Sequence, residues 1–141
     1  MEEGTSASNA AMIHARQFLN DSKNVTLFPN VRAHLAAISA ELALKAVYYM
    51  YYPDGEIKKH ISRNLMGDVC HLSGIQSDSE VVNAAGRLEP HYSASRYPEE
   101  TTRTFDCVAM QVGCWHYPDV IESIVNDAET IVEWASSQLS Q

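Results

Sequence analysis

The stretch VRAHLAAISAELALKAVYYMYY, residues 31–52, decides the fold that this sequence predicts. It contains no Gly or Pro, and residues that favour helix, Ala above all, are frequent in it. Apolar residues occur on nearly every side of the predicted helix, as expected of a helix that other helices surround. Pro53, Asp54 and Gly55 follow and end it. We therefore expect a central, buried helix around which the rest of the chain packs.

Glu41 and Lys45 lie four residues apart within this stretch. A Glu placed four residues before a Lys is in the favourable order for an ion pair on one face of a helix. We predict that Glu41 and Lys45 form a structural pair.

Four further segments carry apolar residues at helical spacing. They cover about residues 9–20, 56–72, 77–88 and 118–139. Ser77 and Glu80 have the spacing of a capping box, Pro90 is expected to limit that helix, and Pro118 suits a first helical turn. Strands are hardly signalled anywhere. The sequence thus predicts an all-α fold, an up-and-down bundle of about five helices.

The chain shows no internal repeat and no domain boundary. We expect a flexible N-terminus over residues 1–8 and a single helical domain over residues 9–141. Residues 93–117 hold no long periodic run, although 105–110 suit a short helix. A connection this long is uncommon in a compact domain unless it is functional.

The charge and composition exclude several classes of protein. The formal net charge is −8, from 10 Lys and Arg against 18 Asp and Glu, which opposes a broad electrostatic grip on nucleic acid. No apolar run approaches the length of a membrane span, and the acidic start of the chain is unlike a signal peptide. The 3 cysteines have no scaffold spacing. We expect a reduced, cytoplasmic protein that makes no contact with a membrane.

Three pieces of the sequence, taken together, resemble the HEPN domain family. They are ISAELALKAVYY (38–49), IKKHISRNL (57–65) and LEPHYSASRYPEE (88–100). The third piece is the most specific, and it resembles the branch with a Ser/Thr-Arg-Tyr-Pro segment, which includes the domain at the end of sacsin. The ending DAETIVEWASSQL (127–139) is similar to that branch as well. The pieces occur in the family's order.

This resemblance implies a helical bundle that commonly forms homodimers. Many prokaryotic members of the family are toxins paired with a small nucleotidyltransferase partner protein. Others are ribonucleases, or modules that bind nucleotides. The ribonuclease members carry an Arg followed, after four to six residues, by a His, and two subunits bring two such motifs together.

No Arg and His in this chain have that spacing. Three residues separate Arg87 from His91, and seven separate Arg63 from His71. Cleavage of RNA at the 2′-hydroxyl needs an acid or base and a cation near the phosphate, so a His and an Arg must converge. Arg87 and His91 would share one face of a continuous helix, but Pro90 precedes His91. They stay candidates for catalysis, and we expect a protein that is not an enzyme by itself.

Two groups of residues are candidates for binding a phosphate-bearing ligand. Lys58, Lys59 and His60 would lie where the third helix begins, and backbone N–H groups at such an end favour anions; the alternative is a solvated basic turn. Arg96 could hold a phosphate through its planar fork, next to Tyr97. Alternatively, Arg96 pairs with an internal acid such as Glu41, and the segment is a structural corner.

Two further patterns favour packing over function. Cys107, Cys114 and His116, with Cys70 and His71 as further ligands, lack the paired spacing of a zinc site, so we expect no metal and no cofactor. The tyrosines at the end of the central helix could stack on a base, although packing or a subunit interface is the commoner role. They are Tyr48, Tyr49, Tyr51 and Tyr52.

The leading hypothesis is a dimerising module that binds a nucleotide or another phosphate-bearing small molecule without catalysis. A ribonuclease toxin that acts with a nucleotidyltransferase antitoxin is one alternative. A pure protein–protein interaction module is the other.

Overall fold

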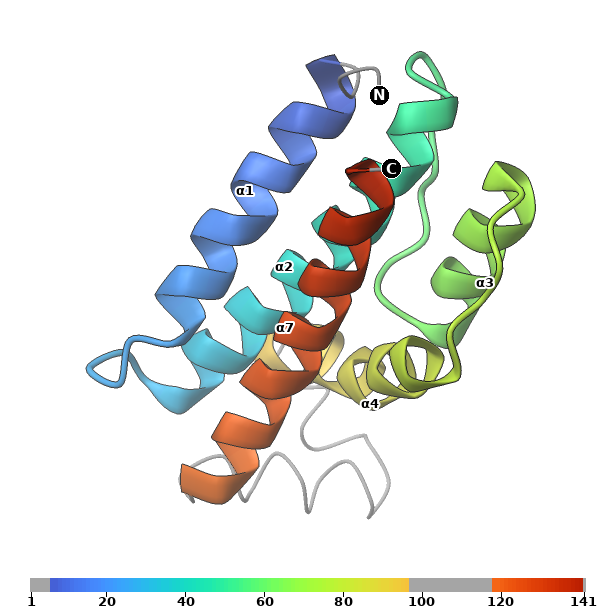
Figure 1. Ribbon diagram of the computed structural model, residues 1–141. Helices are drawn as coiled ribbons and strands as arrows, with labels where there is room; N and C mark the ends of the chain where they lie inside the picture. Colours follow the sequence, from blue (N-terminus) through green and yellow to red (C-terminus); the bar gives the residue numbers. More distant parts are fainter. Residues whose placement is uncertain (1–5, 97–117, 141) are drawn as a thin grey trace.

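The computed structural model describes residues 6–96 and 118–140, with side chains described for 6–93 and 118–140. All the secondary structure in these ranges is helical and packs as a bundle of five helices (Figure 1). The helices are α1 (Ser6–Ser22), α2 (Pro29–Tyr51), α3 (Arg63–Ser73), α4 (Ser79–Arg96) and α7 (Pro118–Leu139). The prediction of an all-α bundle is confirmed.

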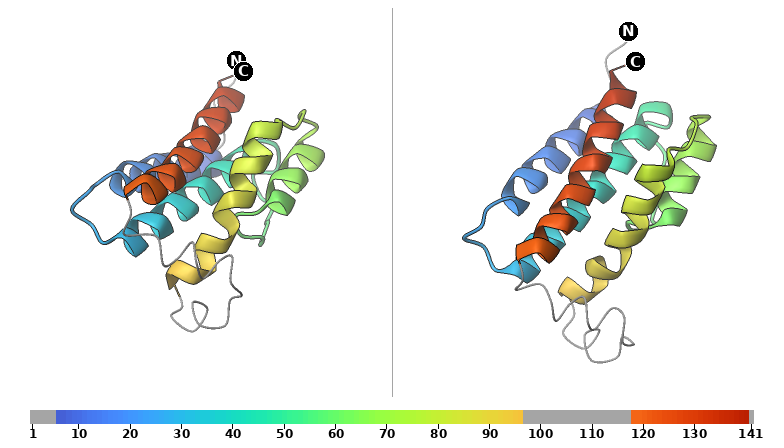
Figure 2. Two further views of the ribbon diagram at one scale, coloured as in Figure 1. Left: turned by 90° about the horizontal axis from the view of Figure 1, so that it is seen from below. Right: turned by 60° about the horizontal axis from the view of Figure 1, so that its bottom comes forward.

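Helix α2 is the centre of the bundle, as its sequence predicts. It packs against each of the other four helices. Its buried residues include Ala36, Ala37, Ala40, Leu44 and Val47, each fully inaccessible to solvent. Helix α1 runs antiparallel to α2, whereas α7 lies beside α2 and runs in the same direction (Figures 1 and 2). The small alanine side chains let the neighbouring helices approach α2 closely from several sides.

The outer helices present one apolar face to α2. Helix α7 begins at Pro118, as predicted, and the apolar stripe along it is buried. The buried residues are Ile121, Ile124, Val125, Ala128, Ile131, Val132 and Ala135. Helix α1 begins at Ser6, three residues before the expected Asn9, and Ser8 is fully buried within it.

The segment before α3 differs from the prediction. Residues 56–62 are not helical, and α3 begins only at Arg63, after Ser62 accepts a hydrogen bond from the N–H of Leu65 at 3.0 Å. Ile57 and Ile61 have the spacing of a helix, but they lie in this non-helical segment, where Ile61 is buried and its N–H donates to Glu41 of α2. His60 therefore lies outside α3, two residues before its cap.

Helix α4 is capped and ended by other residues than those predicted. The cap is Asp78, whose Oδ1 accepts hydrogen bonds from the N–H groups of Glu80 and Val81 at 2.9 and 3.2 Å, so the capping box from Ser77 to Glu80 is wrong. The helix also continues through Pro90 as far as Arg96. A proline inside a helix removes one hydrogen bond, and here the residues on either side of it, Leu88 and His91, are both buried.

Within the described ranges, no helix combines the length and the apolar character needed to cross a membrane.

Candidate functional site

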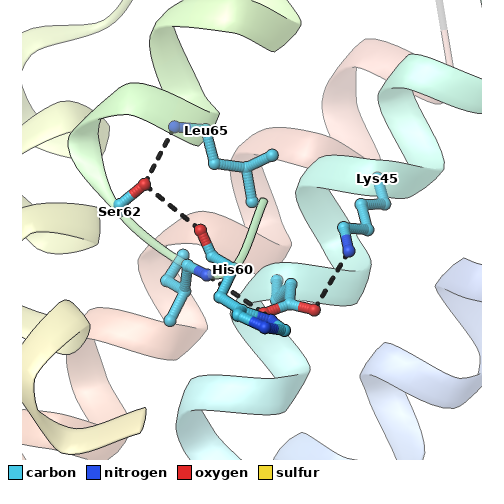
Figure 3. Close-up of polar contacts among 6 residues, drawn as sticks. Lys45, His60, Ser62 and Leu65 are labelled. Atoms are coloured by element: carbon cyan, nitrogen blue, oxygen red, sulfur yellow. Dashed lines mark hydrogen bonds and ion pairs between the residues drawn. The ribbon is translucent and has the colours of Figure 1, made fainter. Parts of the chain in front are cut away.

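The carboxylate of Glu41 holds the segment before α3 against the central helix. Its Oε1 accepts a hydrogen bond from the N–H of Ile61 at 3.0 Å and lies 3.2 Å from Nδ1 of His60, and its Oε2 lies 3.1 Å from Nζ of Lys45 (Figure 3). The side chains of Glu41 and Lys45 are both 13% exposed. The predicted pair of Glu41 and Lys45 thus forms, and it also fixes the position of His60.

The ring of His60 stacks on Tyr92 of α4. The ring centroids are 4.4 Å apart and the planes differ by 22°. The stack borders a cavity of about 350 Å³ between the 59–64 segment and α4. The lining residues are Lys59, His60, Ile61, Ser62, Asn64, Glu89, Tyr92 and Ser93. Two of the three predicted basic candidates, Lys59 and His60, therefore face one cavity.

The two lysines of this segment have different surroundings. Lys59 lines the cavity and forms an ion pair with Asp68 on α3. Lys58 does not line the cavity; its side chain is 83% exposed and lies 3.7 Å from Glu56. The first turn of α3 borders the same cavity, and its backbone N–H groups point toward the helix start, where they favour negative charge. The cavity thus combines an ammonium group, a helix start and an aromatic stack.

A second cavity, of about 480 Å³, lies between α4 and α7 and reaches the start of α3. Arg87 makes a bidentate pair there with Asp127, with Nε–Oδ2 and Nη2–Oδ1 distances of 2.9 and 2.8 Å. The hydrogen bonds to Asp127 raise the pKa of Arg87. The lining residues are Arg63, Gly86, Arg87, Pro90, His91, Asp119, Val120, Ser123, Ile124 and Asp127.

His91 lines this second cavity but is 4% exposed. Burial lowers the pKa of His91 to about 4, because desolvation disfavours the charged ring more than the nearby Asp127 favours it. The ring is therefore neutral near pH 7. Because α4 continues through Pro90, Arg87 and His91 are one helical turn apart on the same cavity, an arrangement that the sequence left in doubt.

The remaining candidate residues are not among the side chains that the structure describes. The backbone of Arg96 ends α4, but its side chain and all of Tyr97 lie outside the described residues, so a pair between Arg96 and Glu41 stays a prediction. Cys107, Cys114 and His116 also lie outside them. Among the described side chains, no group of three or more His, Cys, Asp or Glu residues is placed to hold a metal ion.

Three of the four tyrosines at the end of α2 pack on one another, and the fourth, Tyr51, is exposed. Tyr48 stacks on Tyr52 with ring centroids 5.1 Å apart, and it meets Tyr49 edge to face at 5.6 Å. The hydroxyl of Tyr52 donates to the carbonyl of Leu72 at 2.6 Å, and Tyr48 is buried. These contacts favour the packing role over base stacking.

Two lining residues, Tyr92 and Arg63, were missed by the sequence reasoning. Tyr92 stands next to His91 in the quoted segment LEPHYSASRYPEE, but its partner His60 lies 32 positions earlier in the chain. In the sequence, Arg63 has only its distance from His71 to draw attention to it. Nothing in the sequence pairs either residue with its neighbours in the fold, because those contacts join segments that are far apart along the chain.

Comparison with known proteins identifies the family to which the chain belongs. The chain matches the HEPN domain over residues 8–138, which is most of its length. No curated protein and no solved structure matches it. The helical bundle agrees with the fold that the resemblance implied, and the particular branch of the family is not distinguished by this match. The chain belongs to the HEPN domain family.

Proposed function

We propose that this HEPN domain is a non-catalytic module that binds a nucleotide or another phosphate-bearing ligand. The observation that supports the proposal best is the cavity next to the His60–Tyr92 stack, where Lys59 and the start of α3 meet. Phosphate groups would lie near Lys59 and the helix start. A base would contact the aromatic stack.

Elementary electrostatics favours this position. Anions bind at helix starts because the first backbone N–H groups lack partners within the helix and the helix dipole is positive there. Lys59 is paired with Asp68, but the two side chains are 51% and 41% exposed, and an exposed pair of this kind contributes little stability. A phosphate can therefore take over the ammonium group at small cost. Glu89 lines the same cavity, so the ligand's charge must lie on the Lys59 side of it.

A thermal shift experiment with ATP, ADP, GTP and GDP tests the proposal. A ligand that binds only the folded protein, at a hundred times its Kd, stabilises it by about 2.7 kcal/mol. For a chain of this size the melting temperature then rises on the order of 8 °C. Lys59→Ala should abolish the rise, and Lys58→Ala, the matched control, should keep it. A rise that survives in Lys59→Ala would place the ligand elsewhere.

We also propose that the module is a homodimer, as the family resemblance implies. Sedimentation equilibrium should give about twice the chain mass of 15.7 kDa. A mass that stays at one chain up to high micromolar concentration would remove dimerisation from the proposal without touching ligand binding.

A ribonuclease activity, with a nucleotidyltransferase-type antitoxin as its partner protein, is the second candidate. The specific observation in its favour is that Arg87 and His91 line one cavity. Incubation of a structured RNA with the wild-type protein and with His91→Ala and Arg87→Gln tests it. Cleavage that both variants lose while still folded would support the activity. Absence of cleavage by the wild type at high protein concentration would end it.

A further inference from the structure

Arg63 lies in the second cavity in an unusual setting. Its Nη1 donates a hydrogen bond to Oδ1 of Asn83 at 2.8 Å, which fixes the guanidinium against α4. A Cβ added to Gly86 would stand 2.8 Å from Cζ and 3.0 Å from Cγ of Arg63. The side chain can cross α4 at this point only because residue 86 has no side chain. The position of the guanidinium is therefore set by two residues of α4.

The charge of Arg63 is also unbalanced by its neighbours. Among the lysines and arginines whose side chains the structure describes, Arg16 and Arg63 are the two with no described acid within ion-pair distance. The side chain of Arg63 is exposed, so its charge faces solvent and not a described acid. One of the N–H donors of Arg63 is used by Asn83, and no other partner for Arg63 lies among the described side chains. The remaining donors of the guanidinium are available to a ligand.

The other charges of the cavity limit what can bind. Asp127 has both oxygens occupied by Arg87, so this pair is close to neutral as a unit. Asp119 lines the same cavity and repels anions, most strongly those with two charges. Pro90, Val120 and Ile124 add apolar wall. The lining therefore suits a group with one negative charge and an apolar attachment.

We propose that the cavity between α3, α4 and α7 binds a singly charged oxyanion, a carboxylate or a phosphodiester, with the guanidinium of Arg63 as its anchor. Arg63 offers its planar fork to two oxygens of the ligand, and Gly86 and Asn83 hold the fork in place. This site is separate from the Lys59 cavity and does not rest on the nucleotide proposal.

Titration followed by NMR tests the site with defined probes. The side-chain N–H signals of the arginines are recorded in ¹⁵N-labelled protein during addition of acetate, dimethyl phosphate or sulfate. The variants are Arg63→Gln and Gly86→Ala, with Arg16→Gln as the control, because Arg16 also has no acidic partner among the described side chains. Gly86→Ala keeps the charge of Arg63 and favours the helix, and the atoms that its Cβ would displace belong to the side chain of Arg63.

The expected result is a saturable shift of the Arg63 signal with acetate or dimethyl phosphate. The Kd of the bound probe should rise at least tenfold in Gly86→Ala and stay the same in Arg16→Gln. In Arg63→Gln, the signals of neighbouring residues that shift in the wild type should no longer shift. Whichever of the two singly charged probes binds more tightly identifies the chemical source. Linear shifts that are equal at Arg16 and Arg63, tighter binding of sulfate than of both other probes, or an unchanged Kd in Gly86→Ala would overturn the proposal. None of these outcomes depends on whether nucleotides bind through Lys59.

Discussion

At the scale of single residues, Glu41 connects the central helix to the segment that forms the first cavity. It contacts Lys45 on its own helix and Ile61 and His60 on the segment before α3. The side chains of Glu41 and Lys45 are both mostly buried, so Lys45 relies on the charge of this carboxylate. Removal of one member of a buried ion pair leaves the other uncompensated, which is more costly than the pair itself is stabilising.

Glu41→Gln should therefore destabilise the protein. The amide can still accept the hydrogen bond from the N–H of Ile61, but Lys45 loses its counter-charge. We expect a loss of about 1–3 kcal/mol in the free energy of unfolding, measured by urea denaturation. Glu56→Gln is the control, since Glu56 is 73% exposed, and it should change stability by less than about 0.5 kcal/mol. Equal effects of the two substitutions would contradict the role given to Glu41.

His91 makes stability depend on pH in a direction that is opposite to that of a histidine in an ion pair. Its pKa is about 4 in the folded protein, below the ordinary value of 6.5. The unfolded chain therefore binds a proton first as the pH falls. Between pH 6.5 and about 4 the unfolded state gains protons that the folded state does not, so stability falls with pH.

The predicted loss from His91 is about 2 kcal/mol on going from pH 7 to pH 5. Urea denaturation of the wild type and of His91→Gln at the two pH values measures it as a difference, which cancels the titration of the other groups. The variant should lose less stability than the wild type over this range. Parallel losses in the two proteins would mean that His91 is protonated as readily in the folded chain as in the unfolded one.

At the scale of elements, α4 determines which residues face the second cavity. The helix passes through Pro90, which has no N–H, so the carbonyl of Gly86 lacks the helical donor that residue 90 would supply. The continuation of the helix beyond this point places His91 in the second cavity and Tyr92 in the first. Both cavities thus depend on a helix that the local sequence predicts to stop.

Pro90→Ala should stabilise the protein, because it restores the missing backbone donor. A proline in a helix interior costs about 3 kcal/mol, and since the surrounding packing has adapted to it, we expect a gain of about 1–2 kcal/mol. Pro29→Ala, at the first position of α2, is the control and should be nearly neutral, because no helical bond is missing there. Urea denaturation midpoints measure both. A destabilised Pro90→Ala protein would show that the packing requires the proline.

The elements differ in how well the sequence predicts them, for physical reasons. Residues 31–52 predict α2 because their propensity and their burial favour the same structure. Ile57 and Ile61 mislead because two apolar residues four apart also suit an extended segment that packs on a helix. The position of this segment is decided by the hydrogen bond from Ile61 to Glu41. Glu41 lies 20 residues away in the sequence, so a local pattern does not reveal the contact. The packing of the Arg63 side chain against Gly86 and the stacking of His60 on Tyr92 are also tertiary contacts that a local pattern does not reveal.

At the scale of the whole molecule, the net charge of −8 and the proposed ligand have the same sign. Long-range electrostatics therefore slows the approach of a phosphate-bearing ligand, and affinity must come from short-range contacts. The Lys59 cavity offers these contacts in one place, because the ammonium group, the start of α3 and the His60–Tyr92 stack border the same space. The proposed binding of a phosphate-bearing ligand depends on this cavity more than on any other feature of the molecule.

Calorimetric titration of ADP into the wild type, Lys59→Ala and Lys58→Ala tests that account most directly. The wild type and Lys58→Ala should bind ADP with equal affinity and one site per chain, and Lys59→Ala should bind at least tenfold more weakly. The same weakening should appear with ATP or GDP if either binds. Equal affinities of all three proteins, or no saturable binding of any of these nucleotides by the wild type, would contradict it.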